Sequence, residues 1–598
     1  NTPQYGTFDK KRGTDAGFVR LDWQISDKHL LTVRDNYTND RNPLGLGDNT
    51  SINFLESYGN DKNVDNSLLA TLRSSISSKV TNELKVQHLY TFQESSQGDQ
   101  LSGPIPRAIV KNLISPLGGR NLSTAVQIGG HRFAQEGFTN NVIQLVDNFY
   151  YNTDKVKYTF GLDLMYTNAL SLYGSEVNGR FEYTNSVGTA MQDFDNLRPV
   201  LFYREVPLMD DPSVRASIWN TAIYGQMQTK LAKGLEFTGG LRIDYSKYPK
   251  SPLNQELYKA IGVRTDHELK QFLIQPRIQF NWDVNEKHTD YVRFGAGIFG
   301  SDVNNYVTIN NLSFDGKHFA TVDVTGANVP TPDFIGYRNG TAQVPTLSQF
   351  QVPTINTYAE DAKMPVVYKA NLSYNKLIND NLRIGITGYA TFARNNYMYV
   401  DRNMVANPIF RLANEGNRGV FVPSIPENGT PDWKTGRLTT AFGRVLELNS
   451  KGKVNQFAVV VDGNWRYFKD GEISASYTWN DAKDNTSFNG NVANSATLSL
   501  PVVDDPRDLS RMSYSNGQFR HKVVVYGTLP TFFGFKVGVR YSGIGGTRYT
   551  LLSGANNNGD FVATNDLAFV FDRNNPNVPA SVRNGLQALL DNPNASQS

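Results

Sequence analysis

The feature that most constrains this chain is a strict alternation of apolar and polar residues, which recurs along almost its whole length. In the run 156–167, for example, Lys157 and Asp163 separate large apolar or aromatic side chains. A period of two places the two kinds of residue on opposite faces of a β-strand. Several runs are roughly 9–11 residues long, the length that a tilted strand needs to cross a bilayer. The clearest apolar faces are Val156, Tyr158, Phe160, Leu162, Leu164 and Tyr166; Leu235, Phe237, Leu241, Ile243 and Tyr245; Ile278, Phe280, Trp282 and Val284; and Ile473, Ala475, Tyr477 and Trp479.

The connections between the strands follow a second pattern, in which short turns alternate with long loops. This asymmetry is typical of outer-membrane β-barrels, where the turns are periplasmic and the loops extracellular. Aromatic residues near strand ends, such as Tyr151 and Trp465, match the girdles at the two lipid–water boundaries. We expect eight short turns, near residues 26–29, 77–81, 152–155, 230–234, 285–289, 377–381, 468–471 and 528–534. We expect long loops at approximately 38–66, 93–140, 168–221, 246–272, 301–365, 393–456 and 481–519.

The composition excludes several other classes of protein. Mean hydropathy is −0.43, and no stretch approaches the roughly 18 consecutive apolar residues of a transmembrane helix. The net charge of +3 is too balanced to favour nucleic acid as a partner, and the absence of cysteine excludes disulfides and thiolate metal sites. An aromatic content of 12% with 50 Gly favours strands joined by turns. The predicted fold class is therefore all-β, as a transmembrane antiparallel β-barrel.

The order of turns and loops also predicts where the two ends of the chain lie. A strand near residues 18–25 ends at the first short turn, and the last clear strand, near 535–542, leaves the final short turn. Both ends are therefore expected on the extracellular side. Barrels of this kind keep both termini in the periplasm, so we expect an odd number of strands to be missing at each end. With roughly sixteen strands visible, residues 1–598 are interpreted as the β-barrel domain of a longer protein.

Five short motifs occur in order along the chain: residues 178–183 (NGRFEY), 240–245 (GLRIDY, followed by Pro252 and Asn254), 275–278 (QPRI), 295–299 (GAGIF) and 475–484 (ASYTWNDAKD). In these motifs the chain resembles the Oar-like branch of the TonB-dependent receptor family, which is common in Bacteroidota. The resemblance implies a 22-stranded barrel in the outer membrane of a Gram-negative bacterium, with an N-terminal periplasmic plug and a TonB box. It also implies partners, namely outer-membrane lipid and TonB with its inner-membrane energising proteins, which act through the plug. We find no counterpart of the plug in residues 1–598.

Residues 295–300 (GAGIFG) match the spelling of a dinucleotide-binding motif and follow a predicted strand. That motif must also open a helix, whose N-terminus binds the pyrophosphate. Residues 301–305 (SDVNN) are predicted to form a loop instead. Glycine in a barrel strand commonly allows a bend or a close approach of backbone. We therefore assign no nucleotide site here.

No set of side chains predicts a catalytic, metal or cofactor site. The seven histidines are scattered, whereas zinc needs three or four converging ligands. Acidic residues at 210–211, 481–484 and 504–505 are interpreted as solvated turn residues, because calcium needs six to eight oxygens. Residues 556–560 (NNNGD) are expected to form a flexible loop tip. We nominate no catalytic, cofactor-binding or metal-binding residue and expect no enzymatic activity.

Polar residues of the alternating runs are predicted to line the lumen of the barrel. We expect this of Lys157, Asp163, Glu236, Arg242 and Arg277. The resemblance implies that such residues contact the plug, so they are not proposed to bind cargo. The lysines at the short turns are expected to solvate the turns or to extend along the lipid boundary. They are Lys28, Lys79, Lys155, Lys233, Lys287 and Lys469.

The leading hypothesis is a TonB-dependent outer-membrane transporter whose long extracellular loops bind a specific cargo. One alternative is a passive porin, which roughly sixteen strands alone would permit, although the external termini and long loops disfavour it. Another alternative is a surface adhesion or assembly barrel that displays its loops. The sequence leaves open the cargo, the direction of transport, the oligomeric state, and whether a surface lipoprotein or an exported protein is a partner.

Overall fold

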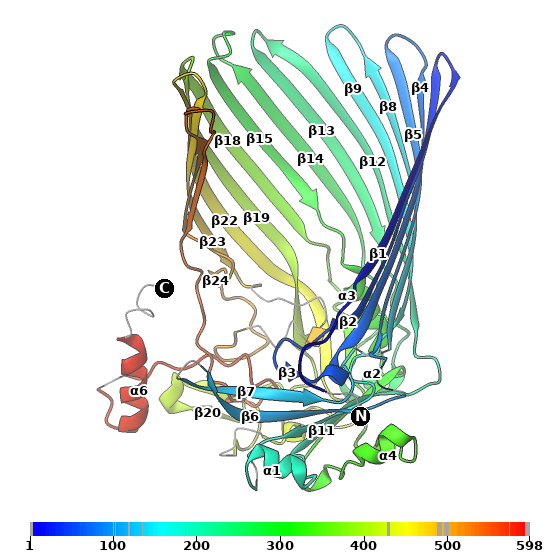
Figure 1. Cartoon of the computed structure of the whole chain (residues 1–598), viewed down its shortest axis with the longest axis vertical. Coiled ribbons are helices and arrows are strands. Elements are labelled where there is room, and N and C mark those ends of the chain that lie inside the picture. The colour runs from blue at the N-terminus through cyan, green and yellow to red at the C-terminus, as the bar shows by residue number, and fades with distance from the viewer. Residues whose placement is uncertain are drawn as a thin grey trace.

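A computed structural model describes residues 4–99, 101, 103–117, 120–133, 135–185, 187–426, 431–486, 493–494, 501–572 and 574–591. One antiparallel sheet dominates and curls into the wall of a tilted cylinder (Figure 1). Of its 18 strands, sixteen follow one another as antiparallel neighbours, while the short β17 (Ile355–Tyr358) and β24 (Ser513–Tyr514) pair with β22 and β23. The wall strands are β1 (Gly13–Ser26), β2 (His29–Leu46), β4 (Gly59–Ser75), β5 (Val80–Gln97), β8 (Glu136–Asn152), β9 (Val156–Leu172), β12 (Val214–Ala232), β13 (Leu235–Lys247), β14 (Lys270–Asp283), β15 (Asp290–Gly300), β18 (Val366–Asn379), β19 (Leu382–Asp401), β22 (Val445–Tyr467), β23 (Gly471–Asp484), β25 (His521–Thr528) and β26 (Gly538–Ile544).

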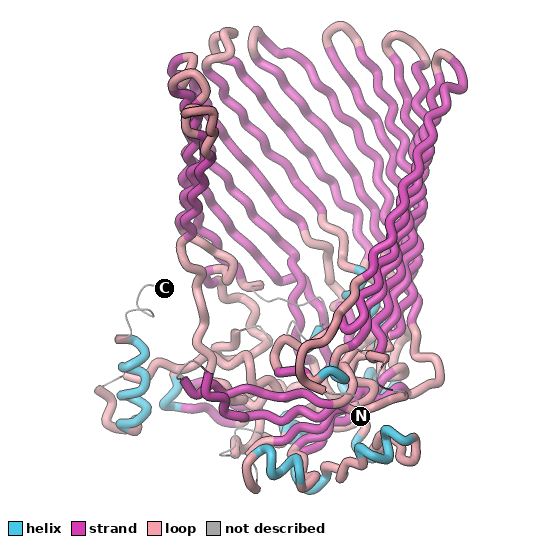
Figure 2. The backbone as a smooth tube through the Cα atoms, in the orientation of Figure 1, coloured by secondary structure: helices cyan, strands magenta, loops and turns pink. Residues whose placement is uncertain are grey.

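The arrangement of turns and loops confirms the predicted topology. Each of the eight predicted turns joins two wall strands, and these turns lie together at one end of the cylinder (Figure 2). The long loops lie at the other end, where the marked N-terminus also lies (Figure 1). The strands reach further into the loop end than expected, because β2 continues to Leu46 and β4 begins at Gly59. The prediction of a loop throughout 38–66 was therefore wrong, since strand pairing continues there without the apolar alternation of the membrane segment.

The outer face of the wall is apolar, as the alternation predicted. Ile223, Ile243 and Ile274 lie side by side across β12, β13 and β14. Ile223 and Ile274 are 57% and 60% exposed, which is unfavourable in water but suits a surface solvated by hydrocarbon. β1 and β26 are the two edges of this wall, and each pairs on one side only within the described part of the chain.

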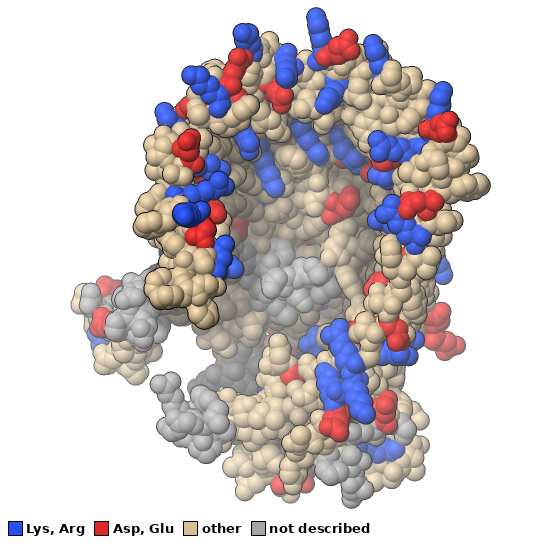
Figure 3. All heavy atoms as spheres, turned by 45° about the horizontal axis from the view of Figure 1, so that its top comes forward, with Lys and Arg blue, Asp and Glu red and all other residues tan. Residues whose placement is uncertain are grey.

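The inner face of the wall is polar. Arg242 donates to Asp163 at 3.1 Å and to Asp244 at 2.7 Å. The strand register places Lys157, Glu236 and Arg277 on this same face, so the predicted lining of the lumen is confirmed. Figure 3 looks into the hollow from the turn end and shows Lys and Arg side chains on the inner wall and around the rim.

Aromatic side chains mark the two lipid boundaries on the outer face. On β9, Tyr158 packs beside Tyr151 at a ring distance of 6.2 Å, and Tyr166 packs beside Trp219 at 4.6 Å. Positions 158 and 166 are separated by about 26 Å along a strand that rises about 3.3 Å per residue. At a strand tilt of about 35–45°, this spacing corresponds to roughly 20 Å along the barrel axis, somewhat less than the apolar band of about 25 Å that is typical of outer-membrane barrels.

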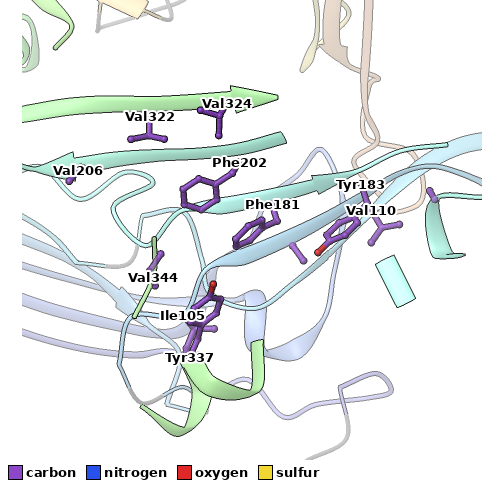
Figure 4. Close-up of a cluster of buried hydrophobic side chains, with 12 residues drawn as sticks. Ile105, Val110, Phe181, Tyr183, Phe202, Val206, Val322, Val324, Tyr337 and Val344 are labelled. Atoms are coloured by element: carbon purple, nitrogen blue, oxygen red, sulfur yellow. The ribbon is translucent and has the colours of Figure 1, made fainter. Parts of the chain in front are cut away.

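A second sheet lies across the loop end of the cylinder (Figures 1 and 2). Its strands, in spatial order, are β16 (Phe319–Thr325), β11 (Leu201–Pro207), β10 (Arg180–Tyr183), β6 (Arg107–Leu117), β7 (Arg120–Ile128) and β3 (Ile52–Asn53). We call these six strands, with α1 (Ala190–Asp195) and α4 (Phe334–Asn339), the cap. Phe181, Tyr183 and Phe202 are fully buried in its core, where Tyr337 of α4 joins them (Figure 4). No motif in the sequence predicted this sheet, because its strands come from four separate loops.

The loop that contributes β16 also folds inward against the wall. Its helix α3 (Asn305–Ser313) packs Ile309 against Ala169, Val214 and Ala216 on the inner face of β9 and β12. The mouth of the cylinder is therefore filled by the chain's own loops. The other α-helices and strands of the described residues are α2 (Gln255–Ile261), β20 (Phe410–Leu412), β21 (Arg418–Val420) and α6 (Ala580–Leu590), and short 3-10 helices occur at Leu55–Ser57, Gly326–Asn328, Ser348–Phe350, Ala413–Glu415 and Trp433–Gly436. Within the described ranges, no helix has both the length and the apolar character of a membrane span.

The assignment of the two faces can be tested with one charge placed on either side of β13. Leu241→Arg, on the outer face, is expected to destabilise the barrel by about 2–4 kcal/mol, because it places a cation in hydrocarbon. Thr238→Arg, on the inner face, is the matched control and should change stability far less. Urea unfolding of the protein refolded into lipid vesicles measures both. Equal losses in the two variants would contradict the assignment.

Candidate functional site: a cavity beneath the cap

A cavity of about 690 Å³ lies between the cap and the inner face of the wall at the loop end. The wall contributes Phe138 and Ser171, which face each other across β8 and β9. The cap strands contribute charged side chains, and α3 contributes Tyr306 and Ile309. The segments 350–356 and 433–446 also contribute side chains to the lining, as do Asn494 and Phe561. Side chains from distant parts of the chain thus meet around one partly open cavity.

On the cap side, a buried carboxylate holds two arginines. Glu176 accepts hydrogen bonds from Arg107 Nε at 3.1 Å and from Arg180 Nη1 at 2.9 Å. Arg180 also donates to Glu182 at 3.0 Å. Burial alone would raise the pKa of Glu176, but the charges of Arg107 and Arg180 outweigh it and hold that pKa below its usual value. Because these side chains come from β6, β10 and the segment before β10, the network fixes one cap strand against another.

A second buried cluster surrounds Asp401, the last residue of β19. Arg437 Nη1 donates to Asp401, and Arg444 Nε lies 3.6 Å from the same carboxylate. The two guanidinium groups also face the ring of Phe561, at 5.4 and 6.0 Å from its centroid. Two arginines share one carboxylate here, and the buried Asp560 also interacts electrostatically with Arg444, so the positive charge on this side of the cavity is only partly balanced by Asp401.

Two further cations line the cavity and form no ion pair within the described part of the chain, namely Arg132 and Lys434. Each contacts an aromatic ring instead. Arg132 lies 4.2 Å from the centroid of Phe133, and Lys434 lies 5.8 Å from that of Trp433. Cation–π contacts at exposed sites contribute only about 0.5–1 kcal/mol. Both cations therefore keep their capacity to bind an anion.

The acidic side of the cavity is partly neutral. Burial raises the pKa of Glu205 to about 7, against its ordinary value of 4.5. Tyr203 donates a hydrogen bond to this carboxyl group, and Thr321 Oγ1 donates another at 3.1 Å. Burial also raises the pKa of Asp323. Near neutral pH, Glu205 thus offsets less of the positive charge than an ordinary glutamate would.

The balance of the lining is cationic and aromatic. Phe138 stacks on Tyr306 at a ring distance of 5.0 Å, and Trp433 meets Phe561 edge-on at 5.5 Å. These rings offer flat apolar surfaces beside the charged groups. The arrangement can hold a ligand that combines an anionic group with a flat apolar part. The basic lining residues are Arg107, Arg132, Arg180, Lys434, Arg437 and Arg444, against the acidic Glu136, Glu176, Glu205 and Asp323.

A sequence profile described as "outer membrane beta barrel domain" matches residues 2–554. The chain belongs to this family. It lies in the outer membrane of a Gram-negative bacterium and crosses that membrane repeatedly with its strands. No curated protein matches the sequence.

Several solved structures are similar to this outer-membrane barrel domain. The outer membrane transporter YddB from Escherichia coli superposes with a TM-score of 0.52 at 12% identity, over 87% of this chain and 55% of that chain. The siderophore receptor PirA from Pseudomonas aeruginosa gives a TM-score of 0.41 at 9% identity, over 88% and 63% of the two chains. The ferric-catecholate import receptor Fiu from Escherichia coli K12 gives 0.46 at 10%, over 93% and 68%. The likeness to YddB concerns the fold alone, and this chain spans a little over half the length of YddB.

Only a few of the residues that line the cavity of this barrel domain were pointed out by a sequence motif. The five predicted lumen residues lie on the wall but do not line the cavity. Arg180 and Glu182 belong to the motif 178–183, which was singled out for its family resemblance and forms β10. Arg132, Glu205 and Lys434 stand in no recognisable motif, so no sequence signal identified them.

The glycines of residues 295–300 lie in the barrel wall, where a Cβ on Gly297 would come within 3.1 Å of Arg277. The atoms near Gly297 belong to the side chains of Arg277 and Phe299, so the glycine makes room for side chains and not for the close approach of backbone that was predicted. The prediction that 301–305 is entirely loop was wrong, because α3 begins at Asn305. Residues 301–304 form a loop between Gly300 and this helix. Asn304 caps the helix, because its side chain accepts a hydrogen bond from Tyr306 N at 2.9 Å.

Three other predictions about polar residues had different outcomes. Within the described ranges no three His, Asp or Glu side chains converge as a metal site, while the prediction of no metal, cofactor or enzymatic activity stays a prediction. Asp481 and Asp504 do not only face solvent, because Arg520 and Arg411 pair with them at 3.0 and 3.2 Å. The prediction of a flexible loop tip at 556–560 was wrong, because its side chains are buried against the external segments.

The raised pKa of Glu205 predicts a pH-dependent stability of this domain. Because the folded state holds the proton more tightly than the unfolded state, the stabilisation is full below about pH 4.5 and is lost as the pH rises to about 7. Glu205→Gln removes this dependence. The difference in unfolding free energy between the variant and the wild type should shift by roughly 3 kcal/mol between pH 4.5 and 8. Thermal or urea unfolding at both pH values measures it, and a pH-independent difference would contradict the prediction.

Proposed function

We propose that this barrel forms the wall and the binding loops of a TonB-dependent outer-membrane transporter. In this proposal the cavity beneath the cap captures a specific cargo at the cell surface. TonB, energised by its inner-membrane partners, then acts through a periplasmic plug to let the cargo pass along the polar lumen. The observation that supports this most is the partly open cationic and aromatic cavity at the mouth of a lipid-spanning wall.

The chemistry of the cavity favours a cargo with an anionic group and a flat apolar part. Arg132 and Lys434 are cations without an ion pair in the described chain, and each stands beside an aromatic ring. A charge-assisted hydrogen bond to such a cation contributes about 1.5–3 kcal/mol. The aromatic pairs around them supply stacking surface that a purely ionic ligand would not use.

A passive porin is a second candidate, and it disagrees with the mouth of the barrel. The cap lies across the loop end and α3 packs on the inner face of β12, so the chain's own loops occupy the entrance. Planar-bilayer recording of the full-length protein separates the two functions. The transporter is expected to show no steady conductance. A steady open current would favour the porin.

A surface adhesion or assembly role would use the outside of the cap rather than the cavity. For that role a surface lipoprotein or an exported protein would be the partner. We infer a binding and transport role without catalysis, because the cavity offers recognition groups for an anion. A variant whose cavity no longer binds cargo, but whose cap is still folded, distinguishes the transport role from the adhesion or assembly role.

Transport predicts that uptake depends on TonB. Cells that express the full-length protein should remove an acidic, aromatic-containing compound from the medium, and an otherwise identical strain without TonB should not. Mass spectrometry of the medium over time measures the depletion. Depletion that is equal in both strains would contradict energised transport.

The cavity predicts which side chains bind the cargo. The double variant Arg132→Ala/Lys434→Ala should weaken cargo binding by roughly 100-fold, because it removes two charge-assisted contacts. Lys259→Ala/Lys317→Ala is the matched control, since it removes the same charge from two exposed positions that do not line the cavity, one in α2 and one before β16. Isothermal titration with the compound identified by depletion measures both affinities. Equal affinities in the two variants would place the cargo elsewhere.

A further inference from the structure

The outer face of the wall carries a groove of about 510 Å³ on β19, β22 and β23, which are neighbours in the sheet (Figure 1). Two small residues form its floor, because Gly463 and Ala475 face each other across β22 and β23. A Cβ built on Gly463 would meet no atom closer than 3.7 Å, so no neighbouring side chain fills the floor. The groove is therefore a depression in the side of the wall that meets lipid.

The side walls of the groove are apolar. Ile384 and Ile386 of β19 are exposed on one side, and Tyr477 of β23 is exposed on the other. The Tyr477 hydroxyl lies within hydrogen-bond distance of His521 Nδ1, at 2.8 Å, and the two rings stack with their centroids 6.1 Å apart. This contact holds the tyrosine ring in place. A groove with such walls suits a hydrocarbon chain better than a polar ligand.

Five cations lie on the same face at the loop end of these strands. On β22 the lipid-facing alternation continues from Phe457 to Lys453, and on β23 it continues beyond Trp479 to position 483. Lys483 lies opposite Asn455, so Lys453 is its diagonal neighbour, about 7–8 Å away. Both lysines lie beyond the aromatic residues of the apolar band, at the level of the lipid head groups. We call the five the basic cluster, which comprises these two lysines with Arg394, opposite Lys453 on β19, and with Arg520 and Arg548.

The basic cluster contains little negative charge of its own. The ring of Tyr514, which lies opposite Lys483, stands among three of the cations. Lys483 Nζ lies 5.2 Å from the ring centroid, and the guanidinium carbons of Arg520 and Arg548 lie 5.6 and 3.9 Å from it. Asp481 pairs with Arg520 at 3.0 Å, whereas the other four cations form no ion pair among the residues that the structure describes. Positive charges gathered in this way repel one another until an anion joins them.

We propose that the basic cluster and the groove together bind a phosphorylated lipid of the outer leaflet, with its phosphate on the cluster and one acyl chain in the groove. Arginine and lysine are the side chains that recognise phosphate. Lys483 stands six positions after Tyr477, a span of about 20 Å along the strand. At a tilt of about 35–45° this becomes roughly 15 Å of depth, a little over half of an apolar band of about 25 Å. A lipid whose head group rests on the cluster therefore reaches the groove with one chain.

Other occupants match only one half of this site. Free phosphate or another small anion would use the basic cluster and leave the groove. A second copy of the barrel in a two-fold dimer would meet the same patch on its partner, because such an interface is built from identical surfaces. The cations of the two copies would then approach each other without a counter-charge. A phosphorylated lipid matches both the charge and the apolar surface. The proposal goes beyond the proposed transport function and does not depend on it.

Lipid binding to the full-length, detergent-solubilised protein tests the role of the cations. Native mass spectrometry measures how much diphosphorylated lipid A the protein retains, and lipid A with the same acyl chains but no phosphates is the reference ligand. The wild type should retain the phosphorylated form preferentially. Lys483→Gln/Arg548→Gln should weaken its binding by roughly 30-fold, because it removes two cations near the membrane surface. The control Lys155→Gln/Lys287→Gln removes the same charge at the short turns of the other end and should bind as the wild type does.

A second pair of variants tests the role of the groove. Ala475→Phe fills the floor with an apolar side chain, so the outer face stays compatible with lipid. The affinity for diphosphorylated lipid A should fall by roughly 10-fold, because about two methylene groups of the chain lose their contact. Ala70→Phe is the matched control, since Ala70 lies between Val33 and Val86 on another part of the lipid-facing surface. This control should leave the affinity unchanged.

Heat-modifiable migration in electrophoresis verifies that each variant is folded. The proposal is overturned if lipid A without phosphates binds equally well, if a folded Lys483→Gln/Arg548→Gln variant keeps the wild-type affinity, or if the two phenylalanine variants bind alike. Displacement of the lipid by inorganic phosphate, but not by chloride at equal ionic strength, would show a small-anion site and also overturn it. So would a dimer mass that Ala475→Phe abolishes, because the groove would then belong to a second copy of the chain.

Discussion

Everything in this structure depends on the fact that hydrocarbon offers no hydrogen bonds to a polypeptide backbone. Each strand that crosses the membrane must pair with a neighbour on both sides, so the chain builds a wall instead of a layered core. Once pairing is imposed, one face of every strand meets lipid and the other meets the lumen. This division explains why Ile223, Ile243 and Ile274 form an apolar row on the lipid-facing side. It also explains why the ion pair between Arg242 and Asp163 lies on the lumen side.

Because both faces of the wall are committed to lipid or to the polar lumen, the close-packed apolar core lies outside the membrane-spanning cylinder. Its outer face is solvated by lipid and its inner face is polar, so the apolar packing of a water-soluble kind is found at the loop end. There Phe181, Phe202 and Tyr183 form the interior of the cap, and Ile309 of α3 packs on the wall. Charged groups enclosed by this packing become costly to leave unpaired, which explains why Glu176 holds two arginines. The cavity lies where the two kinds of packing meet.

Much of the wall could be predicted from the sequence, because the signals there are local. A period of two, a polar turn such as 230–234 and an aromatic near a strand end are each readable within about ten residues. The cap could not be predicted in this way. Its strands pair β6 with β10 in parallel and β11 with β16, across segments from different loops, so an alternating run such as 320–325 does not reveal its partner. The prediction of a flexible loop tip at 556–560 was wrong for a related reason, since Asn and Gly occur both in solvated loop tips and in buried polar turns.

The sequence by itself determined the fold class, the position of the eight turns and which side chains face lipid, because the bilayer acts on every strand in the same way and leaves a regular imprint. Only the tertiary structure decided the functional region. Arg132, Glu205, Lys434 and Phe561 are far apart in the chain, and their charge, protonation and exposure are set by neighbours that the folded loops bring to them. Long-range contacts of this kind leave no periodic trace in a single sequence, since any of many loop arrangements satisfies the membrane equally well.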